Sequence, residues 1–251
     1  MTHPPASEPS SGYDAPAPPA KKASLFEDFL DIFYAPSSVF ARRENFSFWI
    51  PLLIVSLLLG IIALLNADIM QPIMDAEFER GAAAARASNP QITDQQLEAG
   101  RKIGGVMAKV GGFVGTPILI LVTGLVLWIA GKFVEARQTL NAALVVAAYS
   151  QVPRVIELIL NRVQALIVDP STLTGVYSLS IGLARFLDPD TAPRVLVAIA
   201  GRVNLFTIWV TVLLVIGVAV TGKVSRGRAA IVGIIVWVLG ALPALATAMR
   251  G

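Results

Sequence analysis

Residues 203–222 read VNLFTIWVTVLLVIGVAVTG and contain no charged side chain, although Arg202 and Lys223 flank them directly. A helix that crosses about 30 Å of hydrocarbon needs ~20 mostly apolar residues. Inside a bilayer a lone segment satisfies its backbone hydrogen bonds only as a helix, so this stretch is predicted to be a transmembrane helix. The same criterion identifies three further spans, at about 47–67, 110–131 and 229–249.

The overall composition agrees with a membrane protein. Of the 251 residues, 55% are hydrophobic and 15% are charged, whereas soluble domains have about 25% charged residues. The chain has no Cys and a single His, His3, which argues against a disulfide framework and against metal binding or catalysis by these residues. We therefore expect an all-α, polytopic transmembrane bundle with no cofactor and no metal.

A fifth span is predicted at about 139–160, where the sequence is less uniform. Its charge-free part ends at Pro153, which we expect to kink the helix. Arg154 and Glu157 follow, and their spacing of three residues predicts an ion pair on one helix face. The uncharged residues 171–184 are few and contain Gly and Ser, so we interpret them as an interfacial or re-entrant segment, with a sixth span as the alternative.

The distribution of basic residues predicts the orientation in the membrane. Short cytoplasmic loops carry an excess of Lys and Arg. The basic residues concerned precede the first span or lie in the second and fourth connections: Lys21, Lys22, Arg42, Arg43, Lys132, Arg137, Lys223, Arg226 and Arg228. With five spans, this pattern places the N-terminus in the cytoplasm and the C-terminus outside. The helical connection 68–109 and the Arg154–Glu157 pair then lie toward the outer face.

Two elements precede the first span. Residues 1–22 are rich in Pro, Ser and Ala and are predicted to be a disordered cytoplasmic tail, either simply solvated or used to dock a partner. Residues 24–33 read SLFEDFLDIF; Ser24 and Glu27 form a capping box that starts a helix, and Pro36 ends it. We expect its apolar face either to lie on the membrane surface or to pack on the bundle. That face comprises Leu25, Phe26, Phe29, Leu30 and Phe33, and the acidic face comprises Glu27, Asp28 and Asp31.

Small residues recur every four positions before and into the second span, at Gly100, Gly104, Ala108 and Gly112. Such a ridge allows two helices to approach closely. We therefore predict a helix-packing interface there. Its partner lies within the subunit or in another copy of the chain, and the sequence leaves these two possibilities open.

Three strings resemble the Yip-domain family of small five-span membrane proteins: AYSQVP at 148–153, NLFTIWVTVLLVIGVAV at 204–220 and GRAAIV at 227–232. Together with an N-terminal Ala-Pro, they occur in the order and spacing typical of that family. The positions that carry the resemblance are Pro36, Tyr149, Ser150, Pro153, Leu205, Phe206 and Trp209. The resemblance runs from about residue 25 to the C-terminus and implies one membrane domain at 23–251.

The resemblance also implies a role that depends on protein partners, because eukaryotic members of the family interact with Rab-type GTPases in vesicle traffic. Two departures weaken the transfer of that function. Asn204 stands where the family often has an acid, and 68–109 reads as an insertion. The excess of Arg over Lys and the many Ala residues favour a bacterial chain in the cytoplasmic membrane, with a eukaryotic endomembrane as the alternative.

We predict a non-catalytic, membrane-organising scaffold or adaptor, because the chain has no zincin, nucleophile-elbow or phosphate-loop motif. The expected partners are the lipid bilayer and either another protein or a second copy. Nucleic acid is not expected, since no basic stripe is interleaved with aromatic residues. The alternative is a small-solute transporter that uses the polar residues of the third span, namely Asn141, Tyr149, Ser150 and Gln151.

Overall fold

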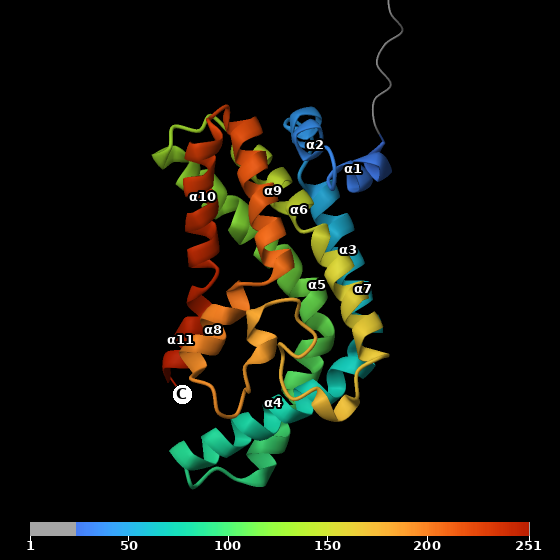
Figure 1. The fold of residues 1–251 in the computed structure, drawn as a ribbon, viewed down its shortest axis with the longest axis vertical. Helices are drawn as coiled ribbons and strands as arrows, with labels where there is room; N and C mark the ends of the chain where they lie inside the picture. Colours follow the sequence, from blue (N-terminus) through green and yellow to red (C-terminus); the bar gives the residue numbers. More distant parts are fainter. Residues whose placement is uncertain (1–23, 251) are drawn as a thin grey trace, which may run out of the picture.

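The computed structural model describes residues 24–250, which form one helical bundle (Figure 1). The α-helices of that part of the chain are α1 Leu25–Asp31, α2 Pro36–Arg43, α3 Trp49–Leu65, α4 Ala67–Ser88, α5 Asp94–Phe133, α6 Leu140–Ser150, α7 Pro153–Ala165, α8 Arg194–Arg202, α9 Leu205–Gly222, α10 Arg226–Leu239 and α11 Leu242–Arg250. Two 3-10 turns, Pro170–Thr172 and Leu183–Phe186, lie between α7 and α8. The all-α class is thus confirmed for the described chain, and the tail predicted at 1–22 lies outside it.

Helix α6 is the centre of the bundle and packs against α3, α5 and α9. Every residue at 142–150 is buried, as expected for a helix that is apolar on all sides. Glycines on its neighbours permit this close approach. A Cβ added to Gly124 of α5 would lie 2.5 Å from Cδ2 of Leu144, and one added to Gly217 of α9 would overlap Val146.

The outward surface of the bundle is apolar as well. On α3 the side chains of Leu53, Leu57 and Ile61 are exposed, while Leu52 and Val55 are buried in the core. A helix with apolar residues on both faces is stable on the outside of a bundle when lipid covers its outer face. The surface of α3 is therefore that of a membrane helix.

Four helical stretches are long and apolar enough to cross a membrane: Asp94–Phe133, Leu140–Ala165, Leu205–Gly222 and Arg226–Met249. Helices α3 and α4 meet at an angle of 74° and add a fifth if the bent pair forms one span. The chain is therefore a multi-pass membrane protein, with four to five candidate spans among the described residues.

The connection predicted at 68–109 consists of α4 and the first part of α5. The two helices are separated by a break at Asn89 and Pro90, and a capping box of Thr93 and Gln96 starts α5. From there α5 continues without interruption for 40 residues. Its residues at 98–111 are exposed throughout, so this part of α5 has an open surface in the single chain.

The predicted span at 229–249 differs from one straight helix. It consists of α10 and α11, which are separated by Gly240 and Ala241. A Cβ at Gly240 would lie 2.8 Å from Nη2 of Arg202, and Pro243 lacks the N–H that would continue the helix. The chain therefore bends at a place where the sequence is uniformly apolar.

The third span breaks between α6 and α7, and Pro153 occupies the first position of α7. This break agrees with the kink expected from the proline. Residues 171–184 form turns, bends and the edges of the two 3-10 turns, so no sixth helical span forms there. An isolated β-bridge between Gly182 and Asn204 joins this segment to the start of α9.

Candidate functional site

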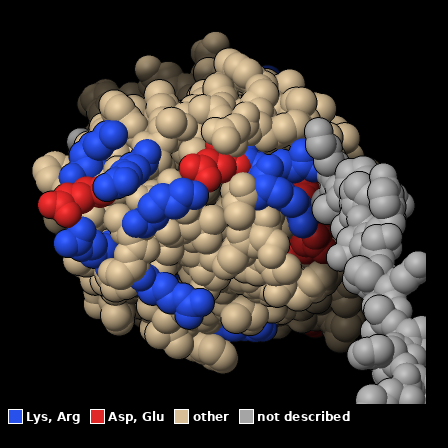
Figure 2. Space-filling view, turned by 90° about the horizontal axis from the view of Figure 1, so that it is seen from above, with Lys and Arg blue, Asp and Glu red and all other residues tan. Residues whose placement is uncertain are grey.

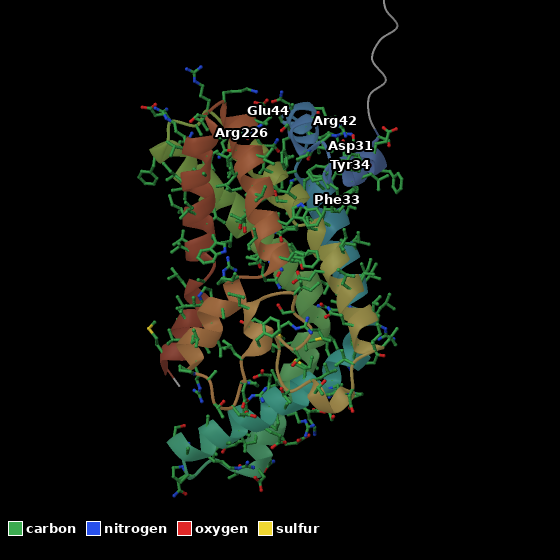
Figure 3. The ribbon with its side chains drawn as sticks, in the orientation of Figure 1. Asp31, Phe33, Tyr34, Arg42, Glu44 and Arg226 are labelled. Atoms are coloured by element: carbon green, nitrogen blue, oxygen red, sulfur yellow. The ribbon has the colours of Figure 1, made fainter. Side chains whose placement is uncertain are left out.

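Helices α1 and α2 form a hairpin, residues 25–43, across one end of the bundle, which we call the hairpin end (Figure 3). At the start of α1 the Ser24 Oγ accepts a hydrogen bond from the Glu27 N–H at 3.2 Å, and the Ser24 N–H donates to the Glu27 carboxylate at 2.6 Å. Pro36 is the first residue of α2, where a missing N–H costs no helical hydrogen bond. The hairpin packs through α2 on α6 and α9.

Asp28 of α1 is fully buried and joins the hairpin to the bundle. Its Oδ1 accepts a hydrogen bond from Nε of Arg42 at 2.6 Å, and its Oδ2 accepts one from Nε of Arg43. The Tyr149 hydroxyl of α6 donates to the same Oδ2 at 3.2 Å. One carboxylate therefore connects α1, α2 and the central helix.

A second ion pair extends this network toward solvent. Asp31 lies 2.6 Å from Nη2 of Arg42, and 29% and 28% of the two side chains are exposed. Burial opposes the charge on Arg42, but the hydrogen bonds that it donates to Asp31 and Asp28 outweigh burial and raise the pKa of Arg42. With Arg43 included, two guanidinium groups pair with two carboxylates, so the formal charges of the network balance.

Aromatic contacts hold the inner side of the hairpin. The ring centroid of Phe29 lies 5.5 Å from that of Tyr149, and Phe33 meets Trp209 of α9 edge-on, also at 5.5 Å. Such pairs contribute about 0.5–1.5 kcal/mol each beyond their buried area. Two residues of the predicted apolar face therefore pack on the bundle.

The other apolar side chains of the hairpin point outward. Phe26 is 73% exposed, Tyr34 71% and Leu30 45%, whereas Leu25 is half-buried. The predicted apolar face is thus divided between the bundle and the surroundings. Phe29 and Phe33 pack on the bundle, and contact of Phe26 and Leu30 with the membrane surface stays a prediction.

Lys and Arg side chains gather on the end face beside the hairpin (Figure 2). Lys223 pairs with Glu44 at 2.8 Å, and Arg228 pairs with Glu135 at 2.8 Å. Glu135 and Lys223 have φ values of 61° and 55° and end α5 and α9 in the left-handed conformation. Arg226 has no ion-pair or hydrogen-bond partner within residues 24–250. The end face therefore keeps positive charge that its own acids do not neutralise.

The polar residues of the third span form contacts between helices. Asn141 donates to the Phe46 carbonyl at 2.8 Å and accepts from the Phe48 N–H at 3.3 Å. Ser150 and Gln151 are buried, and the Ser150 Oγ has no hydrogen-bond partner in the described chain. With Tyr149 bonded to Asp28, the hydrogen bonds of this cluster serve the packing of the hairpin and of α3 on α6.

The motif at the start of the fourth span forms a helix cap. The Asn204 Oδ1 accepts from the N–H groups of Phe206 at 2.8 Å and Thr207 at 3.3 Å. Asn and Asp are equally good N-cap residues. The departure from the family pattern at Asn204 therefore preserves the cap. Leu205 is half exposed, whereas Phe206 is buried.

At the start of α7, Nη1 of Arg154 lies 2.7 Å from Oε2 of Glu157. Arg154 also donates to Oγ1 of Thr207 at 3.4 Å. These residues line a small cavity of about 190 Å³ together with Asn161 and Asn204. The pair thus lies in a polar space between α7 and α9.

The small-residue ridge of α5 is in contact with the rest of the chain at one end only. A Cβ added at Gly112 would lie 3.2 Å from Cα of Gly60 on α3, so the two helices touch there. Added Cβ atoms at Gly100 and Gly104 would meet nothing within 4 Å, and Ala108 is exposed. Most of the ridge therefore remains uncovered in the single chain.

Asp28 is the residue that sequence reasoning misplaced, because we assigned it to a solvated acidic face. The structure buries it completely against Arg42 and Arg43. In the sequence, those two arginines indicate only the orientation in the membrane. A usable signal is the Arg-Arg pair shortly after Pro36, since a chain that folds back at Pro36 brings those arginines to the acids of the preceding helix.

Comparison with known proteins places this site within one family. A family model described as the Yip1 domain matches residues 30–247. The matched range includes Arg42, Arg43 and Tyr149 and begins two residues after Asp28. No curated protein and no solved structure matches the chain.

Proposed function

Because this chain belongs to the Yip1 domain family of membrane proteins, we propose that it is a non-catalytic scaffold that organises the membrane and its partners at the hairpin end. The observation that carries the proposal is the network of Asp28 with Arg42, Arg43 and Tyr149, which we call the clamp. Buried Asp28 fixes α1 to the bundle, so Phe26, Leu30 and Tyr34 are held outward in a defined position. The acids and bases that meet there are paired with one another, and their role is structural.

The exposed side chains suit insertion into lipid at the membrane surface. An interfacial segment of this kind buries its apolar face about 5–10 Å into the bilayer boundary. Each neighbouring Lys or Arg near an anionic leaflet adds about 1 kcal/mol of attraction. In the orientation expected from the basic loops, the hairpin lies in the cytoplasmic leaflet of a bacterial cytoplasmic membrane, and α4 lies on the other side.

The proposal is tested by the depth of the hairpin in a bilayer. The chain has no Cys, so a nitroxide label attaches only at an introduced one. In vesicles with anionic lipid, a label at Phe26→Cys is expected 5–10 Å below the headgroups, while a label at Ser24→Cys is expected in water. Equal aqueous exposure at the two positions would contradict insertion of the hairpin into lipid.

The organising role has its own measurement. At equal protein-to-lipid ratio, we expect the wild-type chain to narrow reconstituted vesicles and a variant with Phe26, Leu30 and Tyr34 changed to Ser to leave their diameter unchanged. A matched control changes Leu53 and Leu57 of α3, which are also exposed, to Ala. If the Ser variant narrows vesicles as the wild type does, the scaffold proposal fails.

Self-association through α5 supplies the partner in this proposal. Around the ridge, Ile103 is 63% exposed and Met107 59%, and small residues between them permit a close second helix. Gly104→Leu with Ala108→Leu fits the single chain without a clash, so a loss of crosslinked dimers reports a contact between copies. Gly227→Leu, equally free of clashes, is the control. An unchanged amount of crosslinked dimer in the double variant would exclude the ridge as the contact between copies.

Transport of a small solute is the second candidate, and the polar cavity of about 190 Å³ beside Arg154 and Glu157 favours it. The polar residues of the third span, which the sequence suggested for transport, are less suitable for binding a solute. Asn141 and Tyr149 already form hydrogen bonds within the chain. Two results together would favour transport over the scaffold. The wild-type chain would carry a solute into vesicles without changing their shape, and Glu157→Gln would abolish that flux.

A further inference from the structure

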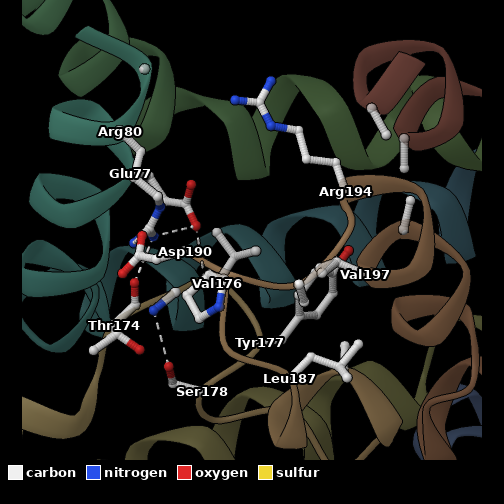
Figure 4. A pocket seen from close by; sticks show the side chains of 18 of the residues that line it. Glu77, Arg80, Thr174, Val176, Tyr177, Ser178, Leu187, Asp190, Arg194 and Val197 are labelled. Carbon is white, nitrogen blue, oxygen red and sulfur yellow. Dashed lines mark hydrogen bonds and ion pairs between the residues drawn. The ribbon is translucent and has the colours of Figure 1, made fainter. Parts of the chain in front are cut away.

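A cavity of about 1070 Å³ lies at the end of the molecule opposite the hairpin (Figure 4). Helices α4, α8 and α11 and the segment 168–192 form its walls. Its volume is at the upper limit of the ~300–1,000 Å³ typical of small-molecule sites. The cavity takes no part in the function proposed for the hairpin end.

Hydrogen bonds hold one wall of this cavity in place. Arg80 of α4 donates to the Thr174 carbonyl at 2.6 Å and to Oδ1 of Asp190 at 3.3 Å, and it pairs with Glu77 at 2.9 Å. The Glu77 carboxylate also accepts from the Val176 N–H at 3.3 Å. The segment 168–192 is therefore tied to α4, and the cavity is preformed.

Arg194, at the start of α8, lines the same cavity and has no hydrogen-bond or ion-pair partner among residues 24–250. Figure 4 shows its guanidinium group extended toward the α4 side of the cavity. The charged residues of the lining are Glu77, Asp190, Arg80, Arg185 and Arg194. Three cations against two acids leave one positive charge, which matches a ligand with one anionic group.

Much of the remaining lining is small and apolar, and it includes Ala83, Ala84 and Ala87 of α4, Val197 of α8, and Ala244 and Ala248 of α11. Residues with hydroxyl groups also line the cavity, namely Thr172, Thr174, Tyr177, Ser178 and Thr247. The alanine walls of α4 and α11 therefore suit an apolar chain, while the arginines and hydroxyl groups suit a polar head group.

Helix α8 also connects the cavity to the lipid-facing surface. Val197 and buried Ala198 line the cavity, whereas Val195, Leu196 and Ile199 of the same helix are 40%, 47% and 48% exposed. Helix α8 packs on α11, which belongs to the candidate span Arg226–Met249, so these exposed apolar residues lie beside a membrane-spanning stretch. A molecule with an acyl chain therefore has a source directly beside the cavity.

We propose that this cavity binds an anionic amphiphile, a molecule with one phosphate or carboxylate group and an apolar chain. The guanidinium of Arg194 binds the anionic group in the paired geometry that favours Arg for phosphate and carboxylate. The chain lies along the alanine walls of α4 and α11. Two sources supply such a molecule, a lipid of the adjacent leaflet and a soluble acyl anion.

The test titrates the purified full chain in non-ionic detergent and counts bound molecules by native mass spectrometry. The probes are dodecyl phosphate, phosphatidylglycerol and inorganic phosphate. Gly81→Leu narrows the cavity beside the alanine wall of α4, and since a Cβ at Gly81 meets nothing within 4 Å the fold tolerates it. Arg194→Gln removes the charge. Gly227→Leu and Arg226→Gln repeat both changes at the hairpin end, where Gly227 is equally open.

We expect one dodecyl phosphate or one phosphatidylglycerol per wild-type chain, and the probe that binds more tightly identifies the source. Arg194→Gln should weaken binding by about tenfold or more, Gly81→Leu should weaken it by obstructing the apolar chain, and the two control variants should bind as the wild type does. Unchanged binding in Gly81→Leu or in Arg194→Gln would overturn the proposal. Inorganic phosphate that binds as tightly as dodecyl phosphate would overturn the role of the apolar chain.

Discussion

Asp28→Asn is the change that examines the clamp most directly. The substitution keeps the shape of the side chain and removes its charge from a site with 0% exposure, beside Arg43 with 14% and Arg42 with 28% exposure. Removing one partner of a buried ion pair costs about 3–5 kcal/mol. Arg42 keeps Asp31 at 2.6 Å, so we take the lower limit, about 3 kcal/mol.

This cost should appear as local opening of the hairpin. A change of about 3 kcal/mol corresponds to a ~100-fold shift in the ratio of docked to undocked hairpin. Hydrogen–deuterium exchange of the reconstituted full chain measures that ratio at residues 25–43. We expect exchange there to accelerate by up to ~100-fold in Asp28→Asn, while α9 remains as protected as in the wild type.

Asp31→Asn is the matched control, because it removes a partly exposed pair on the same helix. Exposed pairs contribute about 0–1 kcal/mol, so its effect on exchange should stay below roughly fivefold. Equal exchange in Asp28→Asn and the wild type would refute the clamp. Equal acceleration in α9 would refute the view that the hairpin opens separately from the bundle.

Four further outcomes are expected. Tyr149→Phe removes one hydrogen bond to Asp28 and keeps the ring, so hairpin protection should fall by about 1 kcal/mol in the same exchange experiment. Asn204→Ala should lower thermal stability in detergent by about 1 kcal/mol through loss of the α9 cap, and Asn204→Asp should restore it. Gly124→Ala should cost about 1–3 kcal/mol in the same melt, because its Cβ meets the backbone of α6. At Asp188, hydrogen bonds from the Asp190 N–H and the Thr191 hydroxyl lower the pKa below the ordinary 3.8. A carboxyl with a lowered pKa stabilises the fold above pH 3.8, and this stability is lost as the pH falls through the lowered value. Hydrogen-exchange protection at 188–192, corrected for intrinsic exchange rates, should therefore be constant between pH 7 and 5.

The clamp and the cavity lie at opposite ends of the bundle and depend on different chemistry. In the hairpin, the buried charge of Asp28 is satisfied by Arg42 and Arg43, and the exposed side chains include Phe26, Leu30 and Tyr34. At the other end, a preformed cavity keeps Arg194 without a partner in the described chain. The first end is suited to fixing a segment at the membrane surface, and the second to binding an anion.

The membrane class and most of its helices could be predicted because they depend on local composition. A charge-free stretch of about 20 residues is helical in lipid whatever surrounds it, and the caps at Ser24 and Thr93 act within three residues. The break at Gly240 could not be predicted in this way. Arg202, which is 38 residues away in sequence, packs against that glycine and donates to the Trp237 carbonyl, and local composition does not indicate this contact.

The sequence by itself determined the class of this protein, four of its candidate spans and the start of its hairpin. Only the tertiary structure decided the role of Asp28, whose periodicity indicates solvent but whose partners include Tyr149, 121 residues further along the chain. It also decided which phenylalanines pack inward and which remain exposed, and it assembled the cavity beside Arg194 from four separate segments. The physical reason is that helix formation in lipid is local, whereas the environment of a charge depends on side chains that folding brings together from distant parts of the chain.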